Sequence, residues 1–185
     1  MNHLPIRSTT ILGVRLGRRV ALAGDGQVTL GEMQLKSRAV KVRSFADGKV
    51  LGGFAGAVAD ALTLFDKFEA KLEEYGQNLQ RATVELAKEW RTDKYLRELD
   101  AMLALMDNRD SYILSGSGDI IDPDDHVISI GSGSGYAMAA ARALIGAGLK
   151  DPRKVVETAM RITADLCIYT NSELTILELG AKPKK

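Results

Sequence analysis

The chain has 185 residues and a mass of 20.0 kDa, a length that suits one domain with a sizeable core. Its hydrophobic fraction of 45%, charged fraction of 26% and net charge of +1 are ordinary for a globular protein and argue against nucleic-acid binding. No apolar stretch approaches the roughly 20 residues of a membrane span, and a single cysteine, Cys167, excludes an internal disulfide. Because the first eight residues also lack the apolar centre of a secretory signal, we expect a cytoplasmic protein.

The first third of the chain has the pattern of strands joined by turns. Alternating and β-branched runs predict strands at residues 10–16, 19–23, 40–45 and 49–54. A polar stretch that contains Gly26 and Gly31 separates the second run from the third. Asp47-Gly48 predicts a hairpin between the last two runs, because both residue types tolerate the positive φ of a tight turn.

The middle of the chain has the period of amphipathic helices. Apolar residues recur every three or four positions over residues 58–72, which predicts a first helix. Gly76 suits the C-terminal cap of this helix, and Asn78 suits the N-cap of the next. The second helical pattern continues as far as Leu103, with a break near residues 91–93. We interpret both apolar stripes as core packing.

Strands return in the last third. The predicted strands are at residues 111–115, 119–121, 126–130 and 173–179. A glycine-rich segment at 131–135 leads into an alanine-rich helix over 136–145. Asp151 as N-cap and Pro152 at the first helical position begin another helix, which reaches Leu166.

The order of elements predicts the fold class. Strands are followed by two helices, more strands, two more helices and a final strand, and hairpins outnumber crossover connections. Mainly antiparallel sheets are therefore expected, and two sheets each need one face covered by helices. We predict an α+β fold, a four-layer αββα sandwich, formed by a single domain over residues 9–185 without an internal linker or repeat.

Thr9 and Thr10 open the first strand and indicate a nucleophile. A threonine hydroxyl is a poor nucleophile, but a cut just before it provides an α-amine that can act as the base. That amine has an unperturbed pKa of about 7.7–8.0, so a usable fraction is neutral near pH 7. We hypothesise that residues 1–8 are a leader and that Thr9 becomes the N-terminal nucleophile of a protease.

Four other residues are candidates for the same site. Asp25 and Lys41 lie at the edges of two early strands; Lys41 would stabilise the deprotonating hydroxyl, and Asp25 would keep Lys41 charged. Gly53, where a strand ends before a helix, could supply an N–H to an oxyanion. Ser132 could supply a hydroxyl near Thr9 to shuttle protons. Taken singly, each of the four also suits an ordinary strand or turn position.

The glycine-rich segment at residues 131–135 supports a different interpretation. A strand, a glycine-rich turn and a helix N-terminus can hold a phosphate, although the strands before this segment resemble an antiparallel hairpin and no Walker-type Gly-Lys-Ser/Thr run is present. A nucleotide-binding module, an N-terminal-nucleophile amidase for small molecules and a catalytically silent ring subunit therefore stand as alternatives to the protease.

Several segments together carry a family resemblance; they lie at residues 9–11, 23–27, 53–56, 59–61, 84–88, 90–93, 130–133 and 167–171. In these segments the chain resembles the HslV (ClpQ) family, the peptidases of bacterial two-component ATP-dependent proteases, which is related to proteasome β subunits. The resemblance covers nearly the whole chain from Thr9 to Leu179. It implies an N-terminal-nucleophile hydrolase fold and threonine endopeptidase chemistry.

The resemblance also implies roles for particular residues. By position, Thr9 matches the family nucleophile, and the other site positions match Asp25, Lys41, Gly53 and Ser132. A monovalent cation, usually sodium, is implied at backbone oxygens of Ala164, Cys167 and Thr170. No nucleotide is expected on this subunit.

The implied assembly has two stacked hexameric rings that enclose the sites. A hexameric AAA+ unfoldase, HslU, docks on the ring ends, unfolds protein substrates with ATP and activates the peptidase. Many family members carry only an initiator methionine before the threonine, whereas eight residues precede Thr9 here. The Ser8–Thr9 bond must therefore be cut, and autocatalysis is one route.

Overall fold

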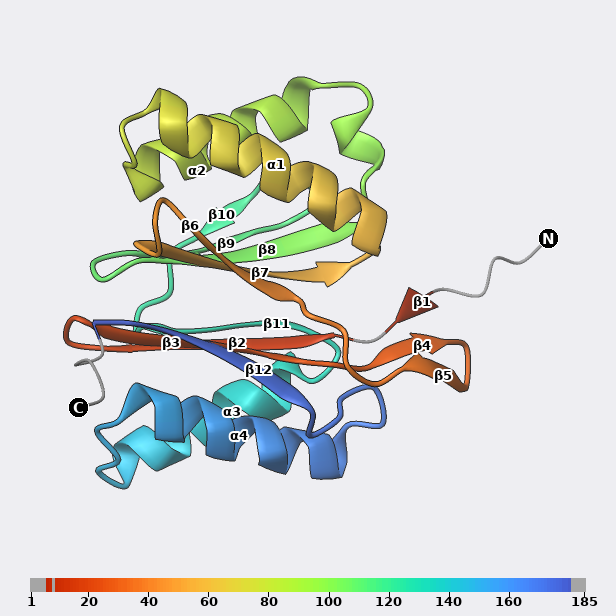
Figure 1. Cartoon of the computed structure of the whole chain (residues 1–185), viewed down its shortest axis with the longest axis vertical. Helices are drawn as coiled ribbons and strands as arrows, with labels where there is room; N and C mark the ends of the chain where they lie inside the picture. Colours follow the sequence, from red (N-terminus) through yellow and green to blue (C-terminus); the bar gives the residue numbers. More distant parts are fainter. Residues whose placement is uncertain (1–5, 8, 181–185) are drawn as a thin grey trace.

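The computed structural model describes residues 6–7 and 9–180, which form the four layers of Figure 1. One sheet contains, in spatial order, β10 (Ile120–Ile121), β9 (Ser111–Leu114), β8 (Ala101–Met106), β7 (Val50–Gly56) and β6 (Val42–Phe45). The other contains β11 (Val127–Gly131), β2 (Thr10–Leu16), β3 (Arg19–Asp25) and β12 (Leu174–Leu179). The two sheets pack face to face in the middle of the molecule.

Two helix pairs form the outer layers (Figure 1). Helices α1 (Val58–Glu74) and α2 (Leu79–Thr92) cover the five-stranded sheet, and α3 (Ser134–Gly146) and α4 (Pro152–Leu166) cover the four-stranded sheet. Every strand pairing in the described residues is antiparallel. The predicted αββα sandwich of mainly antiparallel sheets is confirmed.

Each interface between layers has its own apolar core, because each sheet is buried on both faces. The outer core beneath α1 and α2 includes Phe45, Phe65, Phe68, Leu86 and Trp90. The core between the sheets includes Ile11, Leu22, Leu51, Met106 and Ile128. The core above α3 and α4 includes Leu12, Val14, Ala21, Val155 and Met160. Successive residues of β2 thus point into different cores, as the two-residue period of a strand requires.

The predicted helix caps are confirmed. Gly76 has a φ of +62° after α1, and the Asn78 side chain accepts the N–H of Arg81 at 2.9 Å before α2. Asp151 accepts the N–H of Arg153 at 3.0 Å, with Pro152 as the first residue of α4. These local signals set the ends of the helices independently of the core.

The predicted continuation of the second helix to Leu103 is wrong. The α-helix ends at Thr92, a short 3₁₀ turn follows at Leu96–Glu98, and Leu103 lies in β8, the central strand of its sheet. The sequence of β8, Ala-Met-Leu-Ala-Leu-Met, has no polar residue, and a short apolar run cannot be assigned to strand or helix by period alone.

A third, smaller sheet lies beside the sandwich. It contains β1 (Ile6–Arg7), β4 (Val28–Leu30) and β5 (Met33–Lys36), with β4 in the centre. β4 and β5 fall in the polar stretch between the second and third predicted strands, and β1 falls within the predicted leader. In the described part of the chain, no helix is long and apolar enough to cross a bilayer.

Candidate active site

A cavity of about 460 Å³ lies at one end of the sandwich, where strands of both sheets finish. Thr9, the residue before β2, lines it together with Gly56 at the end of β7, Gly131 at the end of β11 and Ser132 directly after it. The pairing of Gly131 with Thr10 brings the end of β11 beside the start of β2. The topology therefore places Thr9 and Ser132, two of the predicted site residues, in the wall of one cavity.

A buried ion pair lies next to the start of β2. Lys41 Nζ donates to Asp25 Oδ1 at 2.9 Å, and the two side chains are only 3% and 0% exposed. The backbone N–H of Thr10 donates to the same Oδ1 at 2.8 Å. The other carboxylate oxygen accepts the N–H groups of Gln27 at 2.9 Å and Asn171 at 3.4 Å. The charge of Asp25 is thus fully surrounded by donors, which stabilises it away from water.

The environment of the Lys41 ammonium suits a catalytic role. Burial lowers the pKa of Lys41 from its usual range, and the attraction of Asp25 opposes this effect. The ammonium also donates to the carbonyl of Gln27. Through the Thr10 N–H, which shares Asp25 Oδ1 with Lys41, the ion pair is connected to the residue directly after Thr9.

The loop after β11 holds Thr9 by its backbone. The N–H of Ser132 donates to the Thr9 carbonyl at 2.8 Å. Gly131 has a φ of +92°, and a Cβ there would lie 1.9 Å from the Thr9 carbonyl oxygen, so a side chain at this position is excluded. The next N–H, of Gly133, donates to Thr10 Oγ1 at 3.0 Å. Both N–H groups bind the strand of Thr9, and β11 belongs to an antiparallel sheet, so the loop lacks the features of a phosphate-binding turn.

Gly53 does not line this cavity. N–H groups of successive strand residues face opposite neighbours, and the Phe54 N–H donates to the Lys41 carbonyl on the β6 side. The N–H of Gly53 therefore points toward β8. The N–H of Gly56 points to the other side of β7, where β6 does not extend, and Gly56 lines the same cavity as Thr9. A Cβ on Gly53 would lie 2.6 Å from Ile11 Cγ2, so this glycine allows β7 to approach β2 closely.

The predicted cation ligands lie at the C-terminal end of α4. Ala164 is in its last turn, and the carbonyl of Cys167 accepts the N–H of Thr170 at 3.0 Å. Carbonyl oxygens at a helix C-terminus carry partial negative charge and suit a hard cation, so the position fits a monovalent ion. Within the described residues, no group of three or more His, Cys, Asp or Glu side chains could hold a metal.

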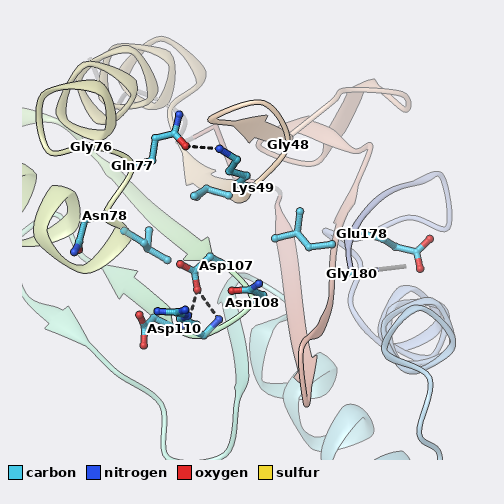
Figure 2. Close-up of a pocket in the computed structure, with 14 residues that line it drawn as sticks. Gly48, Lys49, Gly76, Gln77, Asn78, Asp107, Asn108, Asp110, Glu178 and Gly180 are labelled. Atoms are coloured by element: carbon cyan, nitrogen blue, oxygen red, sulfur yellow. Dashed lines mark hydrogen bonds between the residues drawn. The ribbon is translucent and has the colours of Figure 1, made fainter. Parts of the chain in front are cut away.

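A larger cavity, of about 700 Å³, lies at the end of the sandwich away from Thr9, where β7 begins and β8 ends (Figure 2). Its polar groups already bind one another: Lys49 donates to Gln77 at 2.7 Å, and Asp107 accepts the N–H groups of Arg109 and Asp110 at 2.7 Å each. This cavity lies between the β6–β7, β8–β9 and α1–α2 turns and the end of β12, and contains none of the predicted site residues.

Two residues of the site, Asn171 and Gly56, were not assigned a role from the sequence, and Thr170 was expected only as a ligand of the cation. Asn171 accepts the Gly26 N–H at 3.0 Å and donates to Asp25, so it closes the turn after β3. Thr170 contacts Thr10 through the two hydroxyls at 2.6 Å. Gly56 lines the cavity, and its position at a strand end before a helix was the available signal. Thr170 and Asn171 lie far along the chain from Thr10 and Asp25, so only folding reveals these contacts.

Comparison with known proteins agrees with this geometry. The proteasome subunit family matches residues 6–179 of the chain. The ATP-dependent protease subunit HslV of Pseudothermotoga lettingae is 53% identical over 173 residues, which are 94% of this chain and 98% of that protein. The crystal structure of eukaryotic HslV from Trypanosoma brucei has a TM-score of 0.87 at 46% identity and covers 92% of this chain and 98% of that chain.

A more distant likeness concerns the fold alone. Thiobacillus denitrificans BPH, in complex with epoxomicin, has a TM-score of 0.74 at 20% identity, with 94% of this chain and 100% of that chain covered. The fold and the full-length family match show that the chain belongs to the proteasome family of N-terminal-nucleophile hydrolases. Within that family it belongs with HslV, the peptidase subunit of an ATP-dependent protease, and its activity is that of a threonine peptidase.

Proposed function

We propose that Thr9 is the nucleophile of this peptidase and that cleavage of the Ser8–Thr9 bond creates its catalytic amine. The observation that carries the assignment is the contrast between two neighbouring threonines. Thr9 lines the cavity, whereas the hydroxyl of Thr10 is completely buried and hydrogen-bonded to Gly133 and Thr170. A cut one residue later would thus leave a nucleophile that no substrate reaches.

The proposed reaction uses the Thr9 hydroxyl and its own amine. The hydroxyl attacks the substrate carbonyl, and its proton passes to the amine directly or through water. The positive charge of Lys41 favours the deprotonating hydroxyl, and Ser132 in the same cavity wall helps to move protons. The acyl-enzyme ester that results is hydrolysed by water, with the same amine as the base.

Gly56 is the better candidate for the backbone N–H that stabilises the oxyanion. It lines the cavity with Thr9, and its N–H faces past the end of β6, whereas the N–H of Gly53 faces β8. A backbone donor directed at developing negative charge contributes about 3–4 kcal/mol to such a reaction. We therefore assign this role to Gly56 in preference to Gly53.

Intact-mass measurement with N-terminal sequencing tests the proposal first. A chain that begins at Thr9 and hydrolyses a fluorogenic peptide, more rapidly when the ATPase and ATP are present, is the expected result. A chain that retains residues 1–8 yet has full activity would refute the role of the Thr9 amine. A processed chain without any activity would instead support a silent ring subunit.

The proposed assembly is two stacked hexameric rings, with HslU as the unfoldase that feeds unfolded proteins to the sites in the cytoplasm. An apolar groove between α3 and α4 supports contact with another copy of the chain: it is lined by Tyr136, Leu144, Ile162, Leu166 and neighbouring alanines. Leu166 is 59% exposed and Tyr136 is 50% exposed in the single chain. Free apolar surface of this kind marks an interface.

Leu166→Glu is expected to break a contact between copies of the chain, because it places a charge in the apolar groove. Light scattering after gel filtration would show a smaller mass than that of the wild-type assembly. Tyr95→Glu, at a position that is 81% exposed and outside the groove, serves as the control and should keep the full mass. A Leu166→Glu protein of unchanged mass would remove the α3–α4 groove from the interface.

A monovalent cation such as sodium is proposed at the carbonyls of Ala164, Cys167 and Thr170, where it would stabilise the loop after α4. Replacing Na⁺ with choline at constant ionic strength should lower the melting temperature, by about 2–4 °C for each kcal/mol of binding free energy lost. Adding Na⁺ back should restore it. Equal melting temperatures in both salts would contradict the site.

A further inference from the structure

Thr10 carries a fully buried hydroxyl that the proposed reaction does not use. It is 0% exposed, and its Oγ1 lies 3.0 Å from the N–H of Gly133 and 2.6 Å from the hydroxyl of Thr170. The backbone N–H of Gly133 can only donate, so Thr10 Oγ1 accepts that bond, and the two hydroxyls share the second bond. One side chain thus links the start of β2 to the loop before α3 and to the loop after α4.

The space around this hydroxyl fits the hydrogen bonds closely. A Cβ on Gly133 would lie 2.4 Å from Thr10 Oγ1 and 2.8 Å from Thr170 Oγ1, so only glycine allows the three groups to meet. Thr170 is itself buried. A buried polar group that loses its hydrogen-bond partner destabilises the folded protein, because water cannot replace the partner. Each of the two hydroxyls therefore depends on the other for its hydrogen bond.

The backbone of Thr10 connects the same residue to the charged pair. Its N–H donates at 2.8 Å to Asp25 Oδ1, the atom that accepts Lys41 Nζ at 2.9 Å. The position of Thr10 along the strand therefore fixes how the preceding residue, Thr9, lies relative to Lys41. A shift of Thr10 would therefore move the Thr9 nucleophile, although the chemical groups that contact the substrate would stay the same.

Cleavage before Thr9 makes this connection important. The mature strand would begin at Thr9, and chain ends fray unless they are tied down. We propose that the Thr10 hydroxyl is the positioning group of the nucleophile: its bonds to Gly133 and Thr170 hold the new chain end in register over the Lys41–Asp25 pair. This inference rests on the proposed role of Thr9.

Thr10→Val tests the inference, because valine keeps the shape of threonine and removes the hydroxyl. The variant is made behind a removable domain whose excision leaves Thr9 first, so that self-processing is not required. Since a misplacement of about 1 Å can lower a rate about 100-fold, kcat should fall between about tenfold and 100-fold while KM stays within about twofold. Thr10→Ser keeps the hydroxyl and should recover most of kcat.

The matched control is Thr83→Val. Thr83 is also a fully buried threonine, but its hydroxyl has no hydrogen-bond partner and it lies in α2, on the other side of the molecule from Thr10. This variant should have the wild-type kcat and an equal or higher melting temperature. Intact mass confirms the N-terminus of every variant before the kinetics are measured.

A double-mutant cycle with Thr170→Val separates positioning from plain stability. If the two hydroxyls act as one unit, the double variant should lose no more kcat than either single variant. A Thr10→Val protein that melts earlier but keeps kcat within about twofold would overturn the proposal, since the hydroxyl would then serve the fold alone. If both single variants fail to fold while Thr83→Val folds, the proposal is overturned in the same way. An inactive wild-type chain beginning at Thr9 would instead refute the role of Thr9 itself.

Discussion

Replacing Thr9 with alanine is expected to abolish peptide hydrolysis, with a loss of about 10⁴-fold or more in kcat. The change removes the only atom proposed to attack the substrate, and neither the amine nor Lys41 can take its place. Thr9 lies at the cavity wall and its backbone carbonyl accepts the N–H of Ser132, a bond that alanine keeps. The fold and the assembly should therefore be unchanged.

The measurement is turnover of a fluorogenic peptide by a Thr9→Ala chain whose N-terminus is made by excision of a removable domain. Melting temperature and native mass, compared with those of the wild type, establish that the protein is intact. Thr9→Ser is the matched variant and should keep part of the activity, because it keeps a hydroxyl beside an N-terminal amine. Normal turnover by Thr9→Ala would end the assignment of the nucleophile.

Replacing Lys41 with methionine is expected to lower kcat by about 10²–10³-fold, the usual effect of removing one group that stabilises developing negative charge. It should also destabilise the protein by about 3–5 kcal/mol, because Asp25 becomes a buried charge without its cation. Three backbone N–H groups still donate to that carboxylate, which places the cost toward the lower end of this range.

A second substitution separates the two effects of Lys41. Asp25→Asn in the Lys41→Met background removes the unpaired charge, so the melting temperature should rise again while kcat stays low. Lys88→Met, at an exposed position on α2, controls for loss of a lysine elsewhere. Full activity in Lys41→Met would take this residue out of the mechanism.

The pH profile gives an independent check on Lys41. Because burial lowers its pKa, the wild-type rate should fall on the alkaline side at a lower pH than for an ordinary lysine, as the ammonium loses its proton. In Lys41→Met this alkaline limb should disappear from what activity remains.

Most of the fold follows from short-range patterns in the sequence. The helix ends follow from Asn78, Asp151 and Pro152, whose effects act within one turn of the chain. β8 does not, because its apolar residues are compatible with a buried helix and only its neighbours β7 and β9 select a strand. Tertiary pairing therefore selects the strand there, where the local sequence leaves the choice open.

The site was predictable in its residue types more than in its contacts. Thr9, Asp25 and Lys41 are the start or end positions of early strands, so their proximity was a reasonable inference from hairpins. The choice between Gly53 and Gly56 depends on which way a peptide N–H faces, which follows from the pairing register of β6, β7 and β8. The bond between Thr10 and Thr170 joins residues 160 positions apart, and no local pattern reports it.

The pairing of β1 with β4 gives the proposed maturation a second effect. Ile6 is opposite Leu30 and Arg7 is opposite Thr29, so the leader completes the small sheet on that side. Excision before Thr9 would turn this sheet into a two-stranded ribbon and leave the peptide groups of β4 without their neighbour. An exposed strand edge of this kind can bind an extended chain by main-chain hydrogen bonds, whatever the side chains of that chain. Before cleavage, β1 occupies the edge of β4 to which another extended chain could bind after cleavage.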